Sequence, residues 1–124
     1  MAQTTDVAPR FTITRLTNSS PNVVAIELAG QLDAHTANEF ERFLERTVRN
    51  EGQHRIVFDF QKLDYISSAG LGVLMGLIEE VRAAGGDIKL ANLPERIYHI
   101  LDLLGFPLVF QIFATVPEAE ASFS

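Results

Sequence analysis

The chain has 124 residues, 47% of them hydrophobic and 21% charged, so we expect one globular domain with a single core. It contains no cysteine, which excludes disulfides, thiolate metal sites and a cysteine nucleophile. Sixteen acidic and ten basic residues give a formal charge of −6 without a basic stripe, which disfavours nucleic-acid binding.

The predicted elements follow a simple order. Residues 1–10 show no periodicity and are expected to form a flexible tail ahead of a domain spanning residues 11–124. In chain order, the apolar pattern then predicts a strand at 11–14, a strand at 23–28, a helix at 35–50, a strand at 55–60, a helix at 67–82, a strand at 87–91, a helix at 94–104, a short strand at 108–113 and a helix at 117–123.

This alternation favours an α/β domain with a mixed sheet of four to five strands and about four helices. The first two strands are expected to form an antiparallel hairpin, and the later strands to be parallel and joined by right-handed crossovers. Functional loops in such sheets tend to follow the carboxyl ends of strands.

Two predicted helices carry apolar residues at helical spacing, which indicates one buried face on each. In the helix at 67–82 these residues are Leu71, Leu74, Met75, Ile78 and Val81. In the helix at 94–104 they are Ile97, Ile100, Leu101 and Leu104.

Nothing in the sequence indicates export or a membrane. Residues 1–10 lack a basic segment followed by an apolar core, and the longest apolar run, residues 69–78, is far shorter than the roughly 20 residues that span a bilayer. We therefore expect a cytoplasmic protein without membrane contact.

Two adjacent serines, Ser67 and Ser68, stand where a strand gives way to a helix. The first N–H groups of a helix lack partners and its macrodipole is positive there, so this position favours an anion. Gly70 and Gly72 leave the backbone open to a phosphate or a partner surface. Judged on the residues alone, the alternative is that the serines only cap the helix and the glycines only allow close packing.

The other predicted helix starts differ from this one. Thr36, Asn92 and Thr115 are each followed three residues later by a glutamate, which is the spacing of a capping box. The start at Ser67 has no carboxylate in its first turn, so its helix dipole is left uncompensated.

Three segments together give the chain a family resemblance, which covers nearly all of residues 11–123. They are Gly30-Gln31-Leu32-Asp33, the run from Tyr65 to Leu74, and Leu101-Asp102-Leu103-Leu104-Gly105-Phe106. The chain resembles the STAS domain family and, within it, the small bacterial anti-sigma factor antagonists. The resemblance implies a STAS fold and a non-catalytic phosphoprotein without a cofactor, which acts in signal transduction and transcription regulation as a monomer or weak dimer.

The resemblance also implies a partner-switching mechanism. The unphosphorylated antagonist binds an anti-sigma factor that is also a serine kinase, the kinase phosphorylates one serine and releases the antagonist, and a serine phosphatase restores it. That serine falls on Ser68. Ser67 is a second candidate, because it replaces an aspartate that many members carry immediately before the phosphorylated serine.

The same resemblance places the loop at the start of the first helix beside Ser68. It implies a partner-binding surface made of Asp33, His35, Thr36, Ser67, Ala69, Gly70, Leu71 and Gly72. For Asp33 and Thr36 the alternative is a role limited to satisfying backbone groups. Leu71 is equally a candidate for the core.

Two other functions are conceivable for a chain with this serine turn. A serine hydrolase with Ser68 as nucleophile is disfavoured, because Ile66 occupies the position where a G-x-S-x-G elbow needs glycine and no histidine base has an acid to orient it. The histidines have no ligand spacing, so no metal site is expected. A STAS signalling module for a non-sigma partner, in a phosphorelay or stress-signalling assembly, stays open because nothing in the chain selects the partner kinase.

Overall fold

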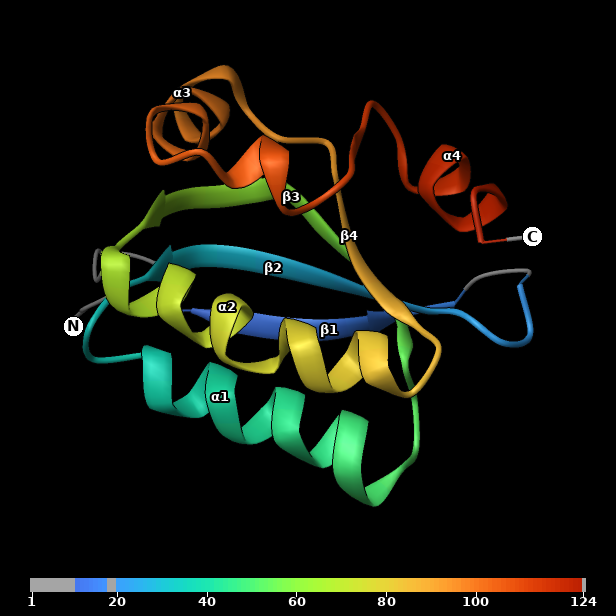
Figure 1. Ribbon diagram of the computed structural model, residues 1–124. Helices are drawn as coiled ribbons and strands as arrows, with labels where there is room; N and C mark the ends of the chain where they lie inside the picture. The colour runs from blue at the N-terminus through green and yellow to red at the C-terminus, as the bar shows by residue number, and fades with distance from the viewer. Residues whose placement is uncertain (1–10, 18–19, 124) are drawn as a thin grey trace, which may run out of the picture.

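A five-stranded mixed sheet organises the computed structural model, which describes residues 11–17 and 20–123 (Figure 1). The predicted tail at residues 1–10 lies outside the described residues. In spatial order the strands are β1 (Thr12–Leu16), β2 (Val24–Leu32), β3 (Arg55–Ile66), β4 (Asp87–Ala91) and β5 (Ile112–Phe113). The first pair is antiparallel and the other pairs are parallel, which confirms the predicted mixed sheet.

The helices cover both faces of this sheet. They are α1 (Ala37–Glu45), continued by the π-helical turn η1 (Arg46–Asn50), then α2 (Ser68–Ala83), α3 (Glu95–Leu103), the short 3₁₀ helix η2 (Phe106–Leu108) and α4 (Val116–Ala121). Figure 1 shows α1 and α2 side by side across one face, with α3 and α4 on the opposite face. None of the helices in the described part of the chain is long and apolar enough to cross a membrane.

Apolar side chains fill both layers because β3 is buried on both faces over residues 56–60. Ile56 and Phe58 belong to the larger cluster with residues of α1 and α2, whereas Val57 packs with Ala119 of α4 in a smaller cluster. The ring of Phe58 contacts that of Phe40 edge to face, with centroids 5.4 Å apart. Burying one such side chain stabilises a fold by about 1.5–3 kcal/mol.

Several element boundaries differ from the prediction. β2 and β3 extend to Leu32 and Ile66, because the two strands keep pairing, through two register irregularities, where the side chains of β3 become polar. The predicted strand at 108–113 is wrong for most of its length. Gly105 has a left-handed φ of 79°, and Phe106 begins a helical turn in which Pro107, which lacks an N–H, is the second residue.

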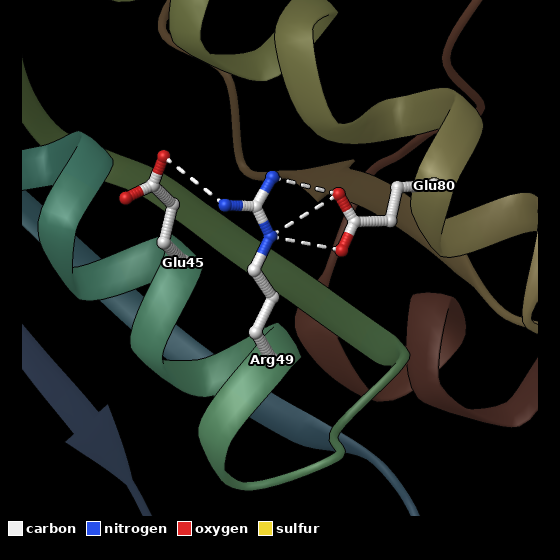
Figure 2. Close-up of polar contacts among 3 residues, drawn as sticks. All are labelled: Glu45, Arg49 and Glu80. Carbon is white, nitrogen blue, oxygen red and sulfur yellow. Dashed lines mark hydrogen bonds and ion pairs between the residues drawn. The ribbon is translucent and has the colours of Figure 1, made fainter.

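A charged cluster joins the end of the first helix to α2. The guanidinium of Arg49 donates to the Glu80 carboxylate, with Nη2–Oε1 at 2.9 Å and Nε–Oε2 at 3.0 Å, and lies 3.6 Å from a carboxylate oxygen of Glu45 (Figure 2). The hydrogen bond from Arg49 holds the pKa of Glu80 below its usual value. The π-helical turn is thereby tied to the second half of α2.

A buried lysine anchors the carboxyl-terminal helix. Lys89 of β4 is only 5% exposed, and its Nζ donates to the Ser122 hydroxyl at 2.6 Å. The same Nζ lies 4.0 Å from the ring centroid of Phe123. Burial lowers the pKa of Lys89, because desolvation penalises its charged form.

Candidate functional site

The start of α2 is fixed against the carboxyl ends of two parallel strands. The Ser67 N–H donates to the carbonyl oxygen of Leu32 at 2.9 Å, which joins the ends of β2 and β3. Ser67 has an extended backbone, with φ −99° and ψ 171°, and its Oγ accepts from the Gly70 N–H at 3.4 Å. Ser67 is therefore the residue that caps α2.

Ser68 is the first helical residue, and its side chain is exposed. Within residues 11–17 and 20–123 its hydroxyl makes no hydrogen bond. The first turn of α2 has no acidic residue, whereas those of α1, α3 and α4 contain Glu39, Glu95 and Glu118. Capping thus accounts for Ser67 and leaves Ser68 as an accessible hydroxyl at an uncompensated positive helix end.

The two glycines of this turn have different roles. Gly70 is buried, and a Cβ built on it would lie 2.6 Å from Leu32 Cγ, so the packing requires glycine there. Gly72 is exposed, and a Cβ there would meet nothing within 4 Å. Ala69 is exposed and Leu71 is 3% exposed, so Ala69 and Gly72 face the surface while Gly70 and Leu71 face the core.

The loop before α1 lies beside this turn. The Asp33 carboxylate accepts from the backbone N–H groups of His35 at 2.9 Å and Thr36 at 3.2 Å. Desolvation raises the pKa of Asp33, but these hydrogen bonds outweigh it and hold the pKa below its usual value. Asp33 directly follows Leu32, whose carbonyl oxygen accepts from the Ser67 N–H, so the backbone of this loop begins beside the start of α2. The His35 side chain is exposed.

Only one of the three predicted capping boxes has its cap hydrogen bond. Thr115 Oγ1 accepts from the N–H three residues on at 3.2 Å. Thr36 makes no such bond, because its hydroxyl accepts from the loop and donates to the Gln31 carbonyl at 2.9 Å. Asn92 adopts a left-handed φ of 57° and donates to Asp59 at 3.2 Å, so it cannot cap α3. Thr36 thus occupies the N-cap position of α1 but lacks the cap hydrogen bond, and the prediction that Asn92 caps α3 was wrong, because Pro94 holds that position.

An apolar groove of about 290 Å³ opens beside Ser68, and three of its six lining residues were not among the predicted site residues. It is lined by Ser68, Leu71, Gly72 and Met75 of α2 and by Leu104 and Phe106 after α3. Met75 is 43% exposed and Leu104 is 58% exposed, so their predicted placement on buried helix faces was wrong. The only feature of the sequence that could have indicated their exposure is that each lies at the edge of the row of apolar residues on its helix.

The STAS domain family model matches residues 15–119. The chain belongs to the STAS domain family. It is 30% identical over 93 residues to the anti-sigma-B factor antagonist of Bacillus subtilis, covering 75% of this chain and 84% of that STAS protein.

Solved STAS structures have the same fold. The anti-sigma factor antagonist SpoIIAA in its unphosphorylated form superposes with a TM-score of 0.74 at 22% identity, covering 87% of this chain and 92% of SpoIIAA. The phosphorylated form of the Bacillus protein SpoIIAA gives a TM-score of 0.68 at 23% identity, covering 91% and 100%. At these identities the likeness establishes the fold, which agrees with the fold predicted from the sequence.

Proposed function

We propose that this STAS protein is an anti-sigma factor antagonist, a cytoplasmic, non-catalytic regulator of transcription. Its unphosphorylated form binds an anti-sigma factor that is also a serine kinase. Phosphorylation of Ser68 by that kinase releases the two proteins, and a serine phosphatase restores the binding form. The observation that carries the proposal is the exposed Ser68 hydroxyl, which has no partner among the residues that the structure describes, at a helix start that Ser67 already caps.

The start of α2 is suited to a phosphorylation switch. A phosphate adds about −1.5 to −2 charges at pH 7, which a positive and exposed helix end accepts without unfolding the domain. Within a protein interface the same charge must be desolvated, which weakens binding. A difference in affinity between the two forms is sufficient for a switch, without a large change of shape.

The proposed partner surface extends from Ser68 over the adjacent loop and helix turn. Its residues are Asp33, His35, Thr36, Ser67, Ala69, Gly70, Leu71 and Gly72. Gly70 and Leu71 are buried, so they act by shaping this surface, whereas the exposed His35, Ala69 and Gly72 are available for direct contact.

Intact-mass measurement tests the site assignment. The wild-type protein, Ser67→Ala and Ser68→Ala are each incubated with ATP and the candidate anti-sigma factor kinases encoded in the same genome. One added phosphate is expected on the wild-type protein and on Ser67→Ala, and none on Ser68→Ala. Phosphate that persists on Ser68→Ala would reassign the site to Ser67.

Calorimetry with the same kinase tests the switch. Ser68→Asp is expected to weaken binding, while Ser68→Ala, which adds no charge, is expected to bind as tightly as the wild-type protein. Equal affinities for all three proteins would contradict an electrostatic switch at this residue.

A further inference from the structure

The carboxyl-terminal end of α3 and the turn that follows it expose three leucines. Leu103 is 72% exposed, Leu104 58% and Leu108 92%, whereas no other large apolar side chain of residues 11–17 and 20–123 is more than half exposed. We call these three residues the leucine patch. A cluster of exposed apolar side chains on a protein surface marks an interaction site more often than single scattered ones do.

The turn that carries the leucine patch has a fixed conformation. The N–H groups of Leu108 and Val109 donate to the carbonyl oxygens of Gly105 at 3.1 Å and Phe106 at 2.9 Å. Phe106 is buried, and its ring stacks on that of Phe110 with the centroids 5.6 Å apart. Leu108 is therefore exposed on an ordered turn, and a surface that is ordered in advance loses little conformational entropy on binding.

The charge of this segment limits the kind of surface that can cover it. No Asp, Glu, Lys, Arg or His occurs between positions 103 and 117, so the leucine patch offers no ion pair to a charged surface. The Arg82 guanidinium does contact the segment, through the carbonyl oxygen of Val109, but Asp87 at 2.9 Å balances its charge. The surface that complements the leucine patch must therefore also be apolar and uncharged.

We propose that the leucine patch is the contact surface of a weak homodimer, in which a two-fold axis packs the patch of one copy against the same patch of the second. Such a contact places one surface against itself, so an apolar and uncharged patch is its own complement. Elsewhere two copies repel each other, because each has a formal charge of −6. The inference goes beyond the proposed function and does not depend on it.

The size of the leucine patch predicts that the dimer is weak. A stable interface buries about 800 Å² on each partner and involves about 20–30 residues a side, far more than three leucines and their neighbours provide. We therefore expect a dissociation constant on the order of 100 μM to 1 mM, so that the chain is monomeric when dilute.

Leu104 connects the leucine patch to Ser68, because both residues line the same groove. A second copy that covers Leu104 narrows the opening of this groove and makes the Ser68 hydroxyl less accessible to a modifying enzyme. A phosphate on Ser68 would in turn disfavour the dimer, because it adds negative charge beside the contact on both copies. Self-association and modification of Ser68 thus oppose each other, a consequence that, unlike the dimer itself, rests on the proposed function.

Sedimentation velocity of the full chain, between about 20 μM and 1 mM, measures the dimer without any partner protein. The wild-type protein is expected to shift from monomer towards dimer over this range. Leu108→Ser is expected to raise the dissociation constant about tenfold or more, as for a central interface residue. Tyr65→Ser alters an exposed apolar residue of β3 outside the patch, and as the matched control it should change the constant less than about threefold.

Equal thermal unfolding midpoints of the two variants control for folding. A wild-type protein that stays monomeric throughout, or equal effects of Leu108→Ser and Tyr65→Ser, would overturn the inference and leave the proposed function standing. Raising the salt concentration from about 50 to 500 mM screens the repulsion between two acidic copies, so the dimer should become tighter. A dimer that salt weakens would be an ionic contact and would refute the leucine patch.

Amide chemical shifts measured across the same concentrations locate the contact. Signals of residues 103–108 and of the groove wall at 68–75 are expected to move in the wild-type protein and to stay in place in Leu108→Ser. Changes confined to residues 103–108 would support the dimer and refute the shielding of Ser68. Changes confined to any other surface would overturn both.

Discussion

Gly70 of α2 lies so close to Leu32 of β2 that a Cβ at position 70 would be 2.6 Å from Leu32 Cγ. Leu32 is fully buried, and its carbonyl oxygen accepts from the Ser67 N–H at 2.9 Å. One residue at the end of β2 thus holds α2 twice, through its side chain and through its backbone. The orientation of Ser68 depends on this contact.

Gly70→Ala is expected to destabilise the fold by about 1–3 kcal/mol, because the added methyl group overpacks a closed region. Gly72→Ala is the matched control. Its methyl group would meet nothing within 4 Å, and replacing a helical glycine by alanine should stabilise by about 0.5–1 kcal/mol. Urea unfolding of both variants measures the two effects, and changes of the same sign would contradict this account.

Ser67→Ala is expected to lower the free energy of unfolding by about 0.5–1 kcal/mol, because it removes the cap of α2. The lower half of the usual range applies, since the hydrogen bond to Gly70 is long, at 3.4 Å. Ser68→Ala should leave stability within about 0.5 kcal/mol of the wild-type value, because it alters an exposed surface position. The same urea titration compares the two variants. A larger loss of unfolding free energy for Ser68→Ala than for Ser67→Ala would show that Ser68, and not Ser67, caps α2.

Ionised Asp33 is expected to stabilise the fold in a pH-dependent way. Its pKa in the folded state is lower than the ordinary value of 3.8, so its contribution is present above that value and disappears as the pH falls through the folded pKa. The difference in unfolding free energy between wild type and Asp33→Asn should therefore be largest near neutral pH and shrink under acid conditions. Urea titrations across this range measure it, and a constant difference would count against the hydrogen-bonded carboxylate.

Lys89 should also make stability rise with pH, but at alkaline pH. Burial lowers its folded pKa below the ordinary 10.5, so between these two values the unfolded chain holds more protons and stability rises with pH. The unfolding free energy of wild type relative to Lys89→Met is thus expected to increase as the pH approaches 10.5 from below. A flat difference, measured by unfolding at several alkaline pH values, would show that the ammonium group is not desolvated beneath α4.

Sequence periodicity predicted the existence and order of the regular elements, because each helix and strand buries a face with its own repeat. The length of β3 could not be predicted in this way. Its second half has exposed residues at positions 61, 62, 64 and 65 and is held by pairing with β2, which is distant in sequence. Nonlocal hydrogen bonding therefore overrides a local pattern that indicates a loop.

In the candidate site, too, features encoded by neighbouring residues could be predicted, whereas features that depend on distant segments could not. Ser67 and Ser68 are adjacent in sequence, so their position at the end of a strand and the lack of a carboxylate in the first turn of the helix could be predicted. The groove needs Met75 of α2 and Leu104 after α3 to meet, and this depends on how the two segments pack. Asp33 accepts the N–H of Thr36, so the helix entry that local spacing assigned to Thr36 is organised by a residue three positions earlier.

The capping role of Ser67 decides which side chains residue 67 tolerates. Serine and aspartate are about equally effective at the N-cap, so exchanging one for the other preserves the backbone while changing the local charge. Ser67→Asp is therefore expected to keep the fold and to place a negative charge one residue before Ser68.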